Sequence, residues 1–229
     1  MSARSRLLNP DDQRRMNPRE QAGTDLFHNV YYDGPAGEGP IFQRTFWMNV
    51  PCLKCPLDLW IYQEILAEVR PDLIIETGTH MGGSALYLAH MLDIIGRGEV
   101  VTIDTLDLPG RPAHPRISYV MGSSADAALI GSLLDPRPAE TRLVILDSDH
   151  SRDHVLAELA LLAPYVTVGS YVIVEDTNIN GHPAYPSYGE GPHEAVEAFT
   201  RTHTNFLADR SREKFLMTFN PGGYLKRVR

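Results

Sequence analysis

Apolar and polar positions follow a regular pattern from Pro56 onward, and their spacing switches between that of helices and that of strands. In "PLDLWIYQEILAEV" the apolar residues recur at helical spacing, and the following "RPD" ends the segment. The short apolar runs typical of buried strands are "LIIE", "EVVTID", "RISYVMG", "RLVILD" and "SYVIVED". Further helices are predicted for "GSALYLAHMLDII", Ala125 to Leu134, "SRDHVLAELALLAPYV" and "HEAVEAFTRT". Short strands near "NFLA" and "FLMTFN", and a final "GYLKRV", are expected to close the chain.

This alternation of strands and helices predicts βαβ units, and therefore an α/β, doubly wound, Rossmann-like sheet with helices on both faces. The chain of 229 residues suffices for one large core, so a single domain is expected over residues 51–229. Residues 1–50 are polar, rich in Pro and Gly and without a clear period, which predicts a partly ordered N-terminal arm. Its aromatic residues Phe42, Phe46 and Trp47 are expected to dock on the core or on a partner subunit.

The charge balance excludes some classes of partner. Lys and Arg number 21 against 29 Asp and Glu, which gives a formal charge of −8. With no long basic block, a general nucleic-acid binder or a protein of anionic membranes is not expected. No stretch has the apolar length of a membrane span or the pattern of a signal peptide, so a cytoplasmic location is expected.

Acidic residues end four of the predicted strands, namely Glu76, Asp104, Asp147 and Glu175. Ligands of such sheets bind beyond these ends. In "LIIETGTHMGGS" the glycines do not form G-x-G-x-x-G, and the acid beside the turn would repel a pyrophosphate. A cationic nucleoside without phosphate, S-adenosylmethionine, fits this turn better, with Asp104 on its ribose. The alternative is a structural turn in another α/β enzyme. The predicted cofactor residues are Glu76, Gly78, Thr79, Gly82, Gly83, Ser84, Asp104, Ser123, Ser124 and Asp149.

A second acidic cluster comes from "VILDSDH" and "IVEDTN", whose strands are expected to be neighbours. Its predicted metal ligands are Asp147, Asp149, Glu175 and Asp176. So many carboxylates do not all stay ionised together without a cation, and oxygen ligands suit Mg²⁺. In the alternative interpretation, Ser148, Asp149 or Ser151 caps the helix that follows, which would explain one acid but not the whole set. His150 and Asp147 are the predicted catalytic residues, with His150 as the general base.

Two further segments carry candidate side chains. The polar loop 177–192 contains His182, Tyr185 and Tyr188, which are expected either to cover the substrate or to hold the loop in place. Cys52 and Cys55 form a C-x-x-C motif, interpreted either as a redox pair or as two small residues before a helix.

Several of these stretches together resemble one family. "ETGTHMGGS" is similar to the first motif of cation-dependent O-methyltransferases, E-x-G-x-x-x-G-x-S. The longer stretches "PLDLWIYQEIL", "RPDLIIETGTHMGGSAL" and "LDSDHSRDHVLAELALLAPYVTVGSYVIVEDTNING" resemble the cephalosporin hydroxylase family, which includes rhamnosyl O-methyltransferases. The resemblance implies a seven-stranded S-adenosylmethionine-dependent methyltransferase sheet with its last strand antiparallel. It also implies Mg²⁺ held by Glu175, Asp176 and either Asp147 or Asp149, with His150 where catechol-type relatives carry a lysine.

The expected function is therefore a Mg²⁺-dependent O-methyltransferase that acts on a hydroxyl of a sugar, a β-lactam or a polyketide-type natural product. Two other classes stay open, an NAD-type oxidoreductase and a non-catalytic helper protein that retains this fold. The aromatic stretch "PIFQRTFWMNVP" favours a homo-oligomer in which the arm covers a neighbouring subunit.

Overall fold

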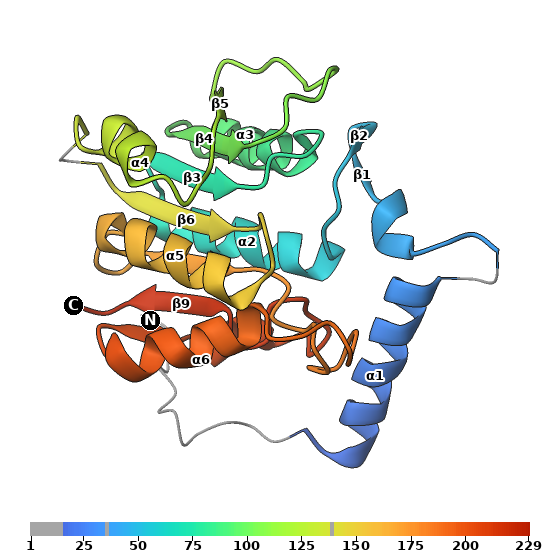
Figure 1. Cartoon of the computed structure of the whole chain (residues 1–229). Helices are drawn as coiled ribbons and strands as arrows, with labels where there is room; N and C mark the ends of the chain where they lie inside the picture. The colour runs from blue at the N-terminus through green and yellow to red at the C-terminus, as the bar shows by residue number, and fades with distance from the viewer. Residues whose placement is uncertain (1–15, 35–36, 138–139) are drawn as a thin grey trace, which may run out of the picture.

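One seven-stranded sheet forms the centre of the computed structural model, which describes residues 16–34, 37–137 and 140–229 (Figure 1). The strand order is β5-β4-β3-β6-β7-β9-β8, and all strands run parallel except β9. This confirms the predicted α/β class and the antiparallel last strand. The strands are β3 (Leu73–Thr77), β4 (Glu99–Asp104), β5 (Ile117–Met121), β6 (Arg142–Leu146), β7 (Tyr171–Val174), β8 (Phe206–Ala208) and β9 (Tyr224–Arg227).

The order of the strands reverses between β3 and β6, and the register there fixes which side chains meet. From β3 the chain moves outward to β4 and β5, and then returns to build β6 and β7 on the other side. Such a reversal leaves a crevice beyond the carboxyl ends of the strands. The pairing of Leu146 with Val174 places the next residues, Asp147 and Glu175, side by side.

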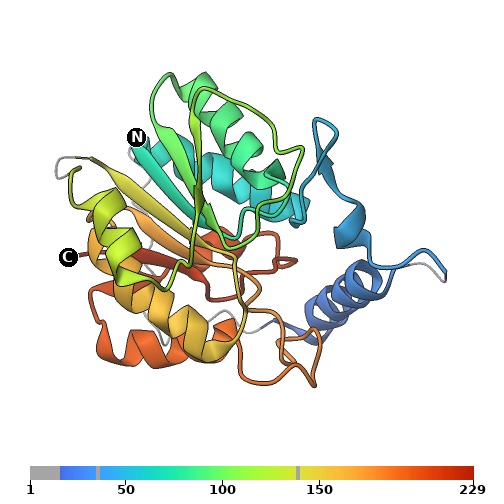
Figure 2. The same ribbon diagram turned by 45° about the horizontal axis from the view of Figure 1, so that its top comes forward.

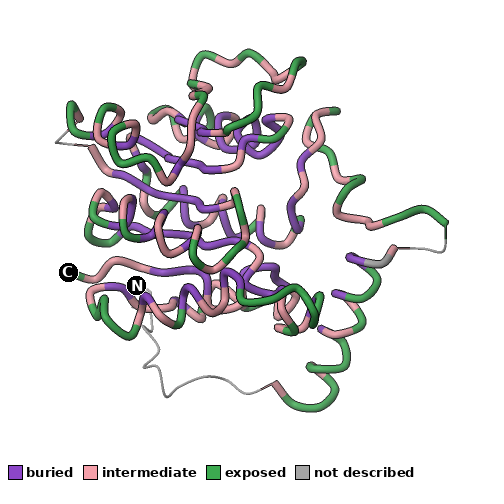
Figure 3. The backbone as a smooth tube through the Cα atoms, in the orientation of Figure 1, coloured by how far each residue is buried: buried purple, intermediate pink, exposed green. Residues whose placement is uncertain are grey.

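Helices cover both faces of the sheet, and buried strands lie between them (Figure 3). One face carries α2 and α3, whose Ile65 and Leu88 are at most 1% exposed. The other face carries α4, α5 and α6, which pack through residues such as Leu159 and Phe199. The bounds are α2 (Pro56–Val69), α3 (Gly83–Ile95), α4 (Ala127–Leu134), α5 (Arg152–Leu162) and α6 (Pro192–Thr202).

The strand predicted at "FLMTFN" is wrong. The segment follows a short 3₁₀ helix, η3 (Arg210–Glu213), and continues through turns. Its polar groups bind the buried carboxylate of Asp58 on α2, which accepts hydrogen bonds from the Thr218 hydroxyl and the Phe219 amide. A buried carboxylate needs such donors, so this contact takes the place of a strand ladder.

The N-terminal arm contains a helix that the sequence pattern did not predict, α1 (Pro18–Asp33). It stands beside the sheet domain and approaches the carboxyl ends of the strands (Figures 1 and 2). Asn17 and Glu20 form a capping box at its start, and Tyr31 and Tyr32 bury their rings near its end. The two tyrosines pack against Phe219 and the loop after β7, so the arm is tied to the domain along part of its length.

A 3₁₀ turn, η1 (Ile41–Arg44), and a hairpin of β1 (Phe46–Trp47) and β2 (Val50–Pro51) join the arm to the domain. Phe42 packs with Tyr32, and the Trp47 indole donates to His90 Nδ1 at 3.0 Å, so both contact the domain side. Phe46 is 60% exposed. Residues 1–15 of the predicted arm lie outside the described residues. No described helix has the length and apolarity needed to cross a membrane.

Gly83, the first residue of α3, lies close against the backbone of the hairpin at Pro51. A Cβ there would lie 2.1 Å from the Pro51 carbonyl oxygen. Gly83→Ala is therefore expected to lower the free energy of unfolding by about 1–3 kcal/mol, measured by denaturant titration. Gly131→Ala in α4 is the control, because a Cβ there meets only the flexible Asp135 side chain at 3.3 Å. The control should gain up to about 1 kcal/mol from helix propensity, and equal losses in both variants would contradict the prediction.

The burial of His28 on α1 is expected to make the docking of the arm sensitive to acid. Burial lowers the pKa of His28 from 6.5 to about 4, against a smaller effect of Asp25. Neither ring nitrogen has a hydrogen-bond partner among the described residues. The imidazole of His28 is therefore protonated more readily in the unfolded chain than in the folded protein. The folded protein keeps its full stability above pH 6.5 and loses part of it as the pH falls toward 4.

Replacing His28 by Phe should remove this dependence, because Phe27 and Phe219 surround the ring with apolar contacts. Between pH 7 and pH 4, the wild type is expected to lose about 2 kcal/mol more stability than the variant in urea titrations. Parallel pH profiles of the two proteins would contradict this role for His28.

Candidate functional site

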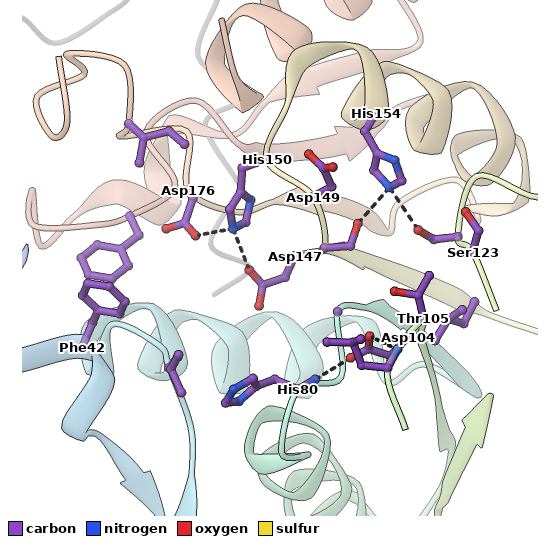
Figure 4. A pocket seen from close by; sticks show the side chains of 18 of the residues that line it. Phe42, His80, Asp104, Thr105, Ser123, Asp147, Asp149, His150, His154 and Asp176 are labelled. Carbon is purple, nitrogen blue, oxygen red and sulfur yellow. Dashed lines mark hydrogen bonds and ion pairs between the residues drawn. The ribbon is translucent and has the colours of Figure 1, made fainter. Parts of the chain in front are cut away.

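A pocket of about 770 Å³ lies beyond the carboxyl ends of the strands (Figure 4). Its walls come from the loops after β3, β4, β5, β6 and β7, together with the N-terminal arm. The predicted site residues that line it are Gly78, Asp104, Ser123, Ser124, Asp147, Asp149, His150, Asp176, Tyr185 and Tyr188. The predicted residues outside its lining are Glu76, Thr79, Gly82, Gly83, Ser84, Glu175 and His182.

The glycine turn after β3 is shaped by contacts within the protein. Gly78 has a φ of +84°, and a Cβ there would lie 1.8 Å from the Asp147 carbonyl oxygen. Only glycine tolerates both this conformation and this approach. Gly82 is also left-handed, and a Cβ on it would press on the Tyr119 hydroxyl at 2.8 Å. The glycines thus let the turn fit against the loop after β6 and against β5.

Glu76 lies under the turn and is fully buried. Its Oε2 accepts from the Thr102 hydroxyl at 2.7 Å, and Thr102 in turn contacts Thr79 at 2.7 Å. Burial raises the pKa of Glu76, against the nearby Lys54 ammonium and hydrogen bonds from Ser84 and Thr102. The hydrogen bonds among Glu76, Thr102 and Thr79 thus link the turn to β3 and β4.

The end of the pocket near β4 and β5 is polar. Asp104 accepts hydrogen bonds from the His80 and Leu106 amides, at 2.8 and 2.9 Å, and pairs with Arg111. These bonds hold the loops after β3 and β4 together at the pocket wall. In the loop after β5, the Ser124 hydroxyl lies 3.3 Å from His154 Nε2 on α5.

Asp147, His150 and Asp176 converge at the opposite end of the pocket, with one potential ligand atom from each within 4.8 Å of the others. His150 Nε2 lies 3.1 Å from Asp176 Oδ2 and 4.0 Å from Asp147 Oδ1 (Figure 4). Burial raises the pKa of Asp147 to about 7. Asp176 has a φ of +53°, a strained conformation for a residue with a side chain. All three side chains line the pocket, and the backbone of one of them, Asp176, is strained.

Asp149 differs from its neighbours. Its Oδ1 accepts from the Ser151 amide at 2.7 Å at the start of α5, and these hydrogen bonds lower the pKa of Asp149. Figure 4 shows its carboxylate turned away from the group of Asp147, His150 and Asp176. Asp149 therefore shapes the turn before α5. The N-cap residue of that helix is Ser151, whose side chain makes no capping hydrogen bond.

Lys54 is a site residue that the sequence analysis missed. Its side chain is 3% exposed, and its ammonium pairs with both Asp147 and Glu175. Burial alone would lower the pKa of Lys54, but the two carboxylates raise it well above its usual value. The one signal in the sequence is a charged residue inside the apolar segment "PCLKCP" directly before a helix.

Tyr32 is the second missed residue, and it comes from the arm. Its hydroxyl lies 3.2 Å from Asp176 Oδ1 and accepts from Asn178 Nδ2 at 2.9 Å. Its ring meets that of Tyr185 edge-on at 4.7 Å between centroids. With Phe42 and Phe219 these rings form an aromatic wall beside the acidic group. No periodicity in residues 1–50 pointed to this contact.

The loop after β7 has two parts with different contacts. Tyr185 and Tyr188 line the pocket. His182 stacks on His193 at 3.6 Å and lies 3.0 Å from Glu194, so it is held against α6. The loop is thus anchored at one point and faces the pocket at another.

The two cysteines of the C-x-x-C motif are free and buried, at 3% and 1% exposure. Burial raises the pKa of Cys52 to about 12 and raises that of Cys55 as well. A redox pair needs an accessible, acidic thiol. The contacts therefore favour the interpretation as small packing residues before α2.

Comparison with known proteins gives one family. The family described as Rhamnosyl O-methyltransferase/CmcI matches residues 41–228. A rhamnosyl O-methyltransferase of Mycobacterium bovis is 42% identical over 216 residues, covering 90% of this chain and 85% of the relative. That of Mycobacterium leprae is 41% identical over 209 residues, covering 88% and 89%.

Among solved structures, the fold is similar to that of CmcI. A CmcI structure with Mg and S-adenosylmethionine has a TM-score of 0.62 at 20% identity, covering 97% of this chain and 89% of that chain. A CmcI structure with S-adenosylhomocysteine has a TM-score of 0.60 at 22% identity, covering 97% of both chains. At this level of identity the likeness is one of fold.

The buried thiols give a direct prediction. In native protein at pH 8, iodoacetamide is expected to modify neither Cys52 nor Cys55, because both are buried and protonated. In guanidinium chloride both should react, which intact-mass spectrometry measures as two added groups. Rapid labelling of the native protein would contradict the packing interpretation and return weight to a redox role.

Proposed function

The chain belongs to the rhamnosyl O-methyltransferase/CmcI family, and on this basis we propose that it is a divalent-cation-dependent methyltransferase that uses S-adenosylmethionine. The methyl group would go to a hydroxyl of a sugar or a sugar-bearing natural product. The observation that carries the proposal is the group Asp147, His150 and Asp176, which opens onto one end of a pocket whose other end is polar.

The polar end of the pocket suits the proposed methyl donor. Asp104 ends β4 at the pocket wall and would face the ribose hydroxyls, while Ser123 and Ser124 follow β5 beside it. The turn at Gly78 lacks the glycine spacing of a diphosphate cradle, which favours a nucleoside ligand without phosphate. A solved structure of CmcI holds Mg and S-adenosylmethionine, which is consistent with this assignment.

The acidic end fits a hard divalent cation. Asp147 and Asp176 would supply carboxylate oxygens, and Glu175 lies next to Asp147. His150 lies beside them and is taken as the proton acceptor, not as a ligand. Asp149 is left out of the proposed ligand set because its carboxylate binds the Ser151 amide. A cation bound here would lower the pKa of an acceptor hydroxyl and fix its position.

The protein side chains then have defined roles. The imidazole of His150 would receive the proton of the acceptor hydroxyl. Its Nε2 lies 3.1 Å from Asp176 Oδ2 and would first have to leave that carboxylate, which a cation bound by Asp176 would allow. The walls of the pocket hold the acceptor oxygen in line with the methyl group and exclude water. The rings of Tyr32, Tyr185 and Phe42 offer flat apolar surface to one face of a sugar or a fused ring system.

The other classes considered have less support. An NAD-type oxidoreductase needs a diphosphate cradle, and the turn after β3 lacks its spacing. A non-catalytic helper would not need the strained Asp176 or the converging group around it. The cytoplasmic location and the homo-oligomer stay predictions; for the latter, Phe46 and Met48 of the hairpin are 60% and 70% exposed.

Replacing Asp176 by Asn is the test of this function. Formation of S-adenosylhomocysteine would be measured with a panel of deoxysugar glycosides, β-lactams and polyketides as acceptors, with Mg²⁺ present. The variant is expected to lose at least about a hundredfold in turnover, because Asp176 serves both the cation and His150. Calorimetric binding of S-adenosylhomocysteine should change little, since the cofactor end of the pocket is intact.

The matched control is Asp149→Asn, which alters a carboxylate of the same pocket that binds the Ser151 amide before α5. It should keep turnover within about fivefold of the wild type. Unchanged turnover in Asp176→Asn would reject the proposed catalytic group. Binding of NAD⁺ in place of S-adenosylhomocysteine by the wild type would reject the methyltransferase.

A further inference from the structure

The segment "PCLKCP" has no role in the proposed chemistry, yet it delivers the buried charge of Lys54 to the site. Cys52 and Cys55 flank this lysine and are themselves buried, so the segment is packed on both sides of it. A lysine this deeply buried is rare and costly unless it is paired. Its position therefore calls for a physical explanation.

Asp147 is shared between two positions suited to a cation. Its Oδ2 contacts the Lys54 ammonium, which also contacts Glu175 Oε1. Its Oδ1 faces the other way, toward His150 Nε2 and the side of Asp176 that lines the pocket. The inner position is thus filled by the ammonium of the protein itself, and the outer position opens onto the pocket.

The two positions are coupled by charge. A cation in the outer position and the Lys54 ammonium would share one carboxylate in a poorly solvated site, and like charges at such distances repel strongly. A cation that used Glu175 as well would have to draw that carboxylate away from the ammonium. Both arrangements place Lys54 in opposition to the divalent cation.

We propose that Lys54 is a resident cation of the site, which neutralises Asp147 and Glu175 in the metal-free protein and weakens the binding of the divalent cation. This inference rests on the proposed function, since it takes the group of Asp147, His150 and Asp176 as the cation site. It assigns to Lys54 two measurable effects of opposite direction. The ammonium stabilises the protein without metal and lowers its affinity for metal.

The alternative is an ion pair with a purely structural role. In that case Lys54 would hold Asp147 and Glu175 in place for the metal, and its loss would weaken metal binding together with the fold. The sign of the change in affinity therefore separates the two roles. Activity is not needed for this distinction.

The experiment uses the whole chain and its variant Lys54→Met, which removes the charge and keeps an unbranched side chain one heavy atom shorter. Binding of Mg²⁺ and Mn²⁺ to EDTA-treated, desalted protein is measured by calorimetry. Lys54→Met is expected to bind both ions at least about tenfold more tightly than the wild type. Its melting temperature in EDTA should be lower than that of the wild type, and the rise on adding Mg²⁺ should be larger.

Lys214→Met is the matched control, because Lys214 pairs with Glu64 on the surface and its side chain is 46% exposed. It should leave metal affinity unchanged. If Lys54→Met does not fold in EDTA, Glu175→Gln is compared with the double variant Lys54→Met/Glu175→Gln. These two proteins differ only in the ammonium, and the double variant is expected to bind metal more tightly.

Equal or weaker metal binding after removal of Lys54 overturns the inference and leaves the proposed function standing. Absence of metal binding in the wild type and in both Lys54 variants overturns the inference together with the metal dependence. Binding of S-adenosylhomocysteine in that second case would still support the cofactor assignment, so the two failures are distinguishable.

Discussion

The arrangement of the site depends on one interaction, the burial of the Lys54 ammonium between Asp147 and Glu175. The register of β6 and β7 places these two carboxylates side by side at the sheet edge, where both cannot stay charged without a partner. Lys54 supplies the compensating charge from a segment that precedes the whole sheet in the sequence. The same segment leads into α2, so the packing of that helix and the electrostatics of the pocket are linked.

A second constraint concerns the backbone around Asp147. Its carbonyl oxygen fills the space that a side chain at position 78 would need, so the turn after β3 and the loop after β6 fit together only with glycine there. This contact crosses the point where the strand order reverses. Gly78, at the proposed cofactor end of the pocket, therefore lies directly against Asp147, at its acidic end.

Much of this architecture was predictable because it follows from local patterns. Apolar runs ending in Glu76, Asp104, Asp147 and Glu175 define parallel strands, and parallel strands place their carboxyl ends at one edge. Lys54 and Tyr32 were not predictable, because their roles arise from contacts with residues more than 90 positions away. The strand expected at "FLMTFN" failed for a similar reason. The Thr218 hydroxyl and the Phe219 amide of this segment donate hydrogen bonds to the carboxylate of Asp58, which is distant in the sequence.

The docking of α1 also bears on the order in which the chain is assembled during synthesis. Tyr31 and Tyr32 leave the ribosome long before Phe219, against which both pack. Until then the two rings can contact only parts of the chain that are made earlier, such as Phe42 and Tyr185, and their contact with Phe219 is missing. Contacts between such distant parts of a chain form late and leave apolar surface exposed in the meantime. The nascent protein would thus expose apolar side chains of α1 while the sheet is being made. The aromatic wall beside the acidic group would be complete only after Phe219 had emerged from the ribosome.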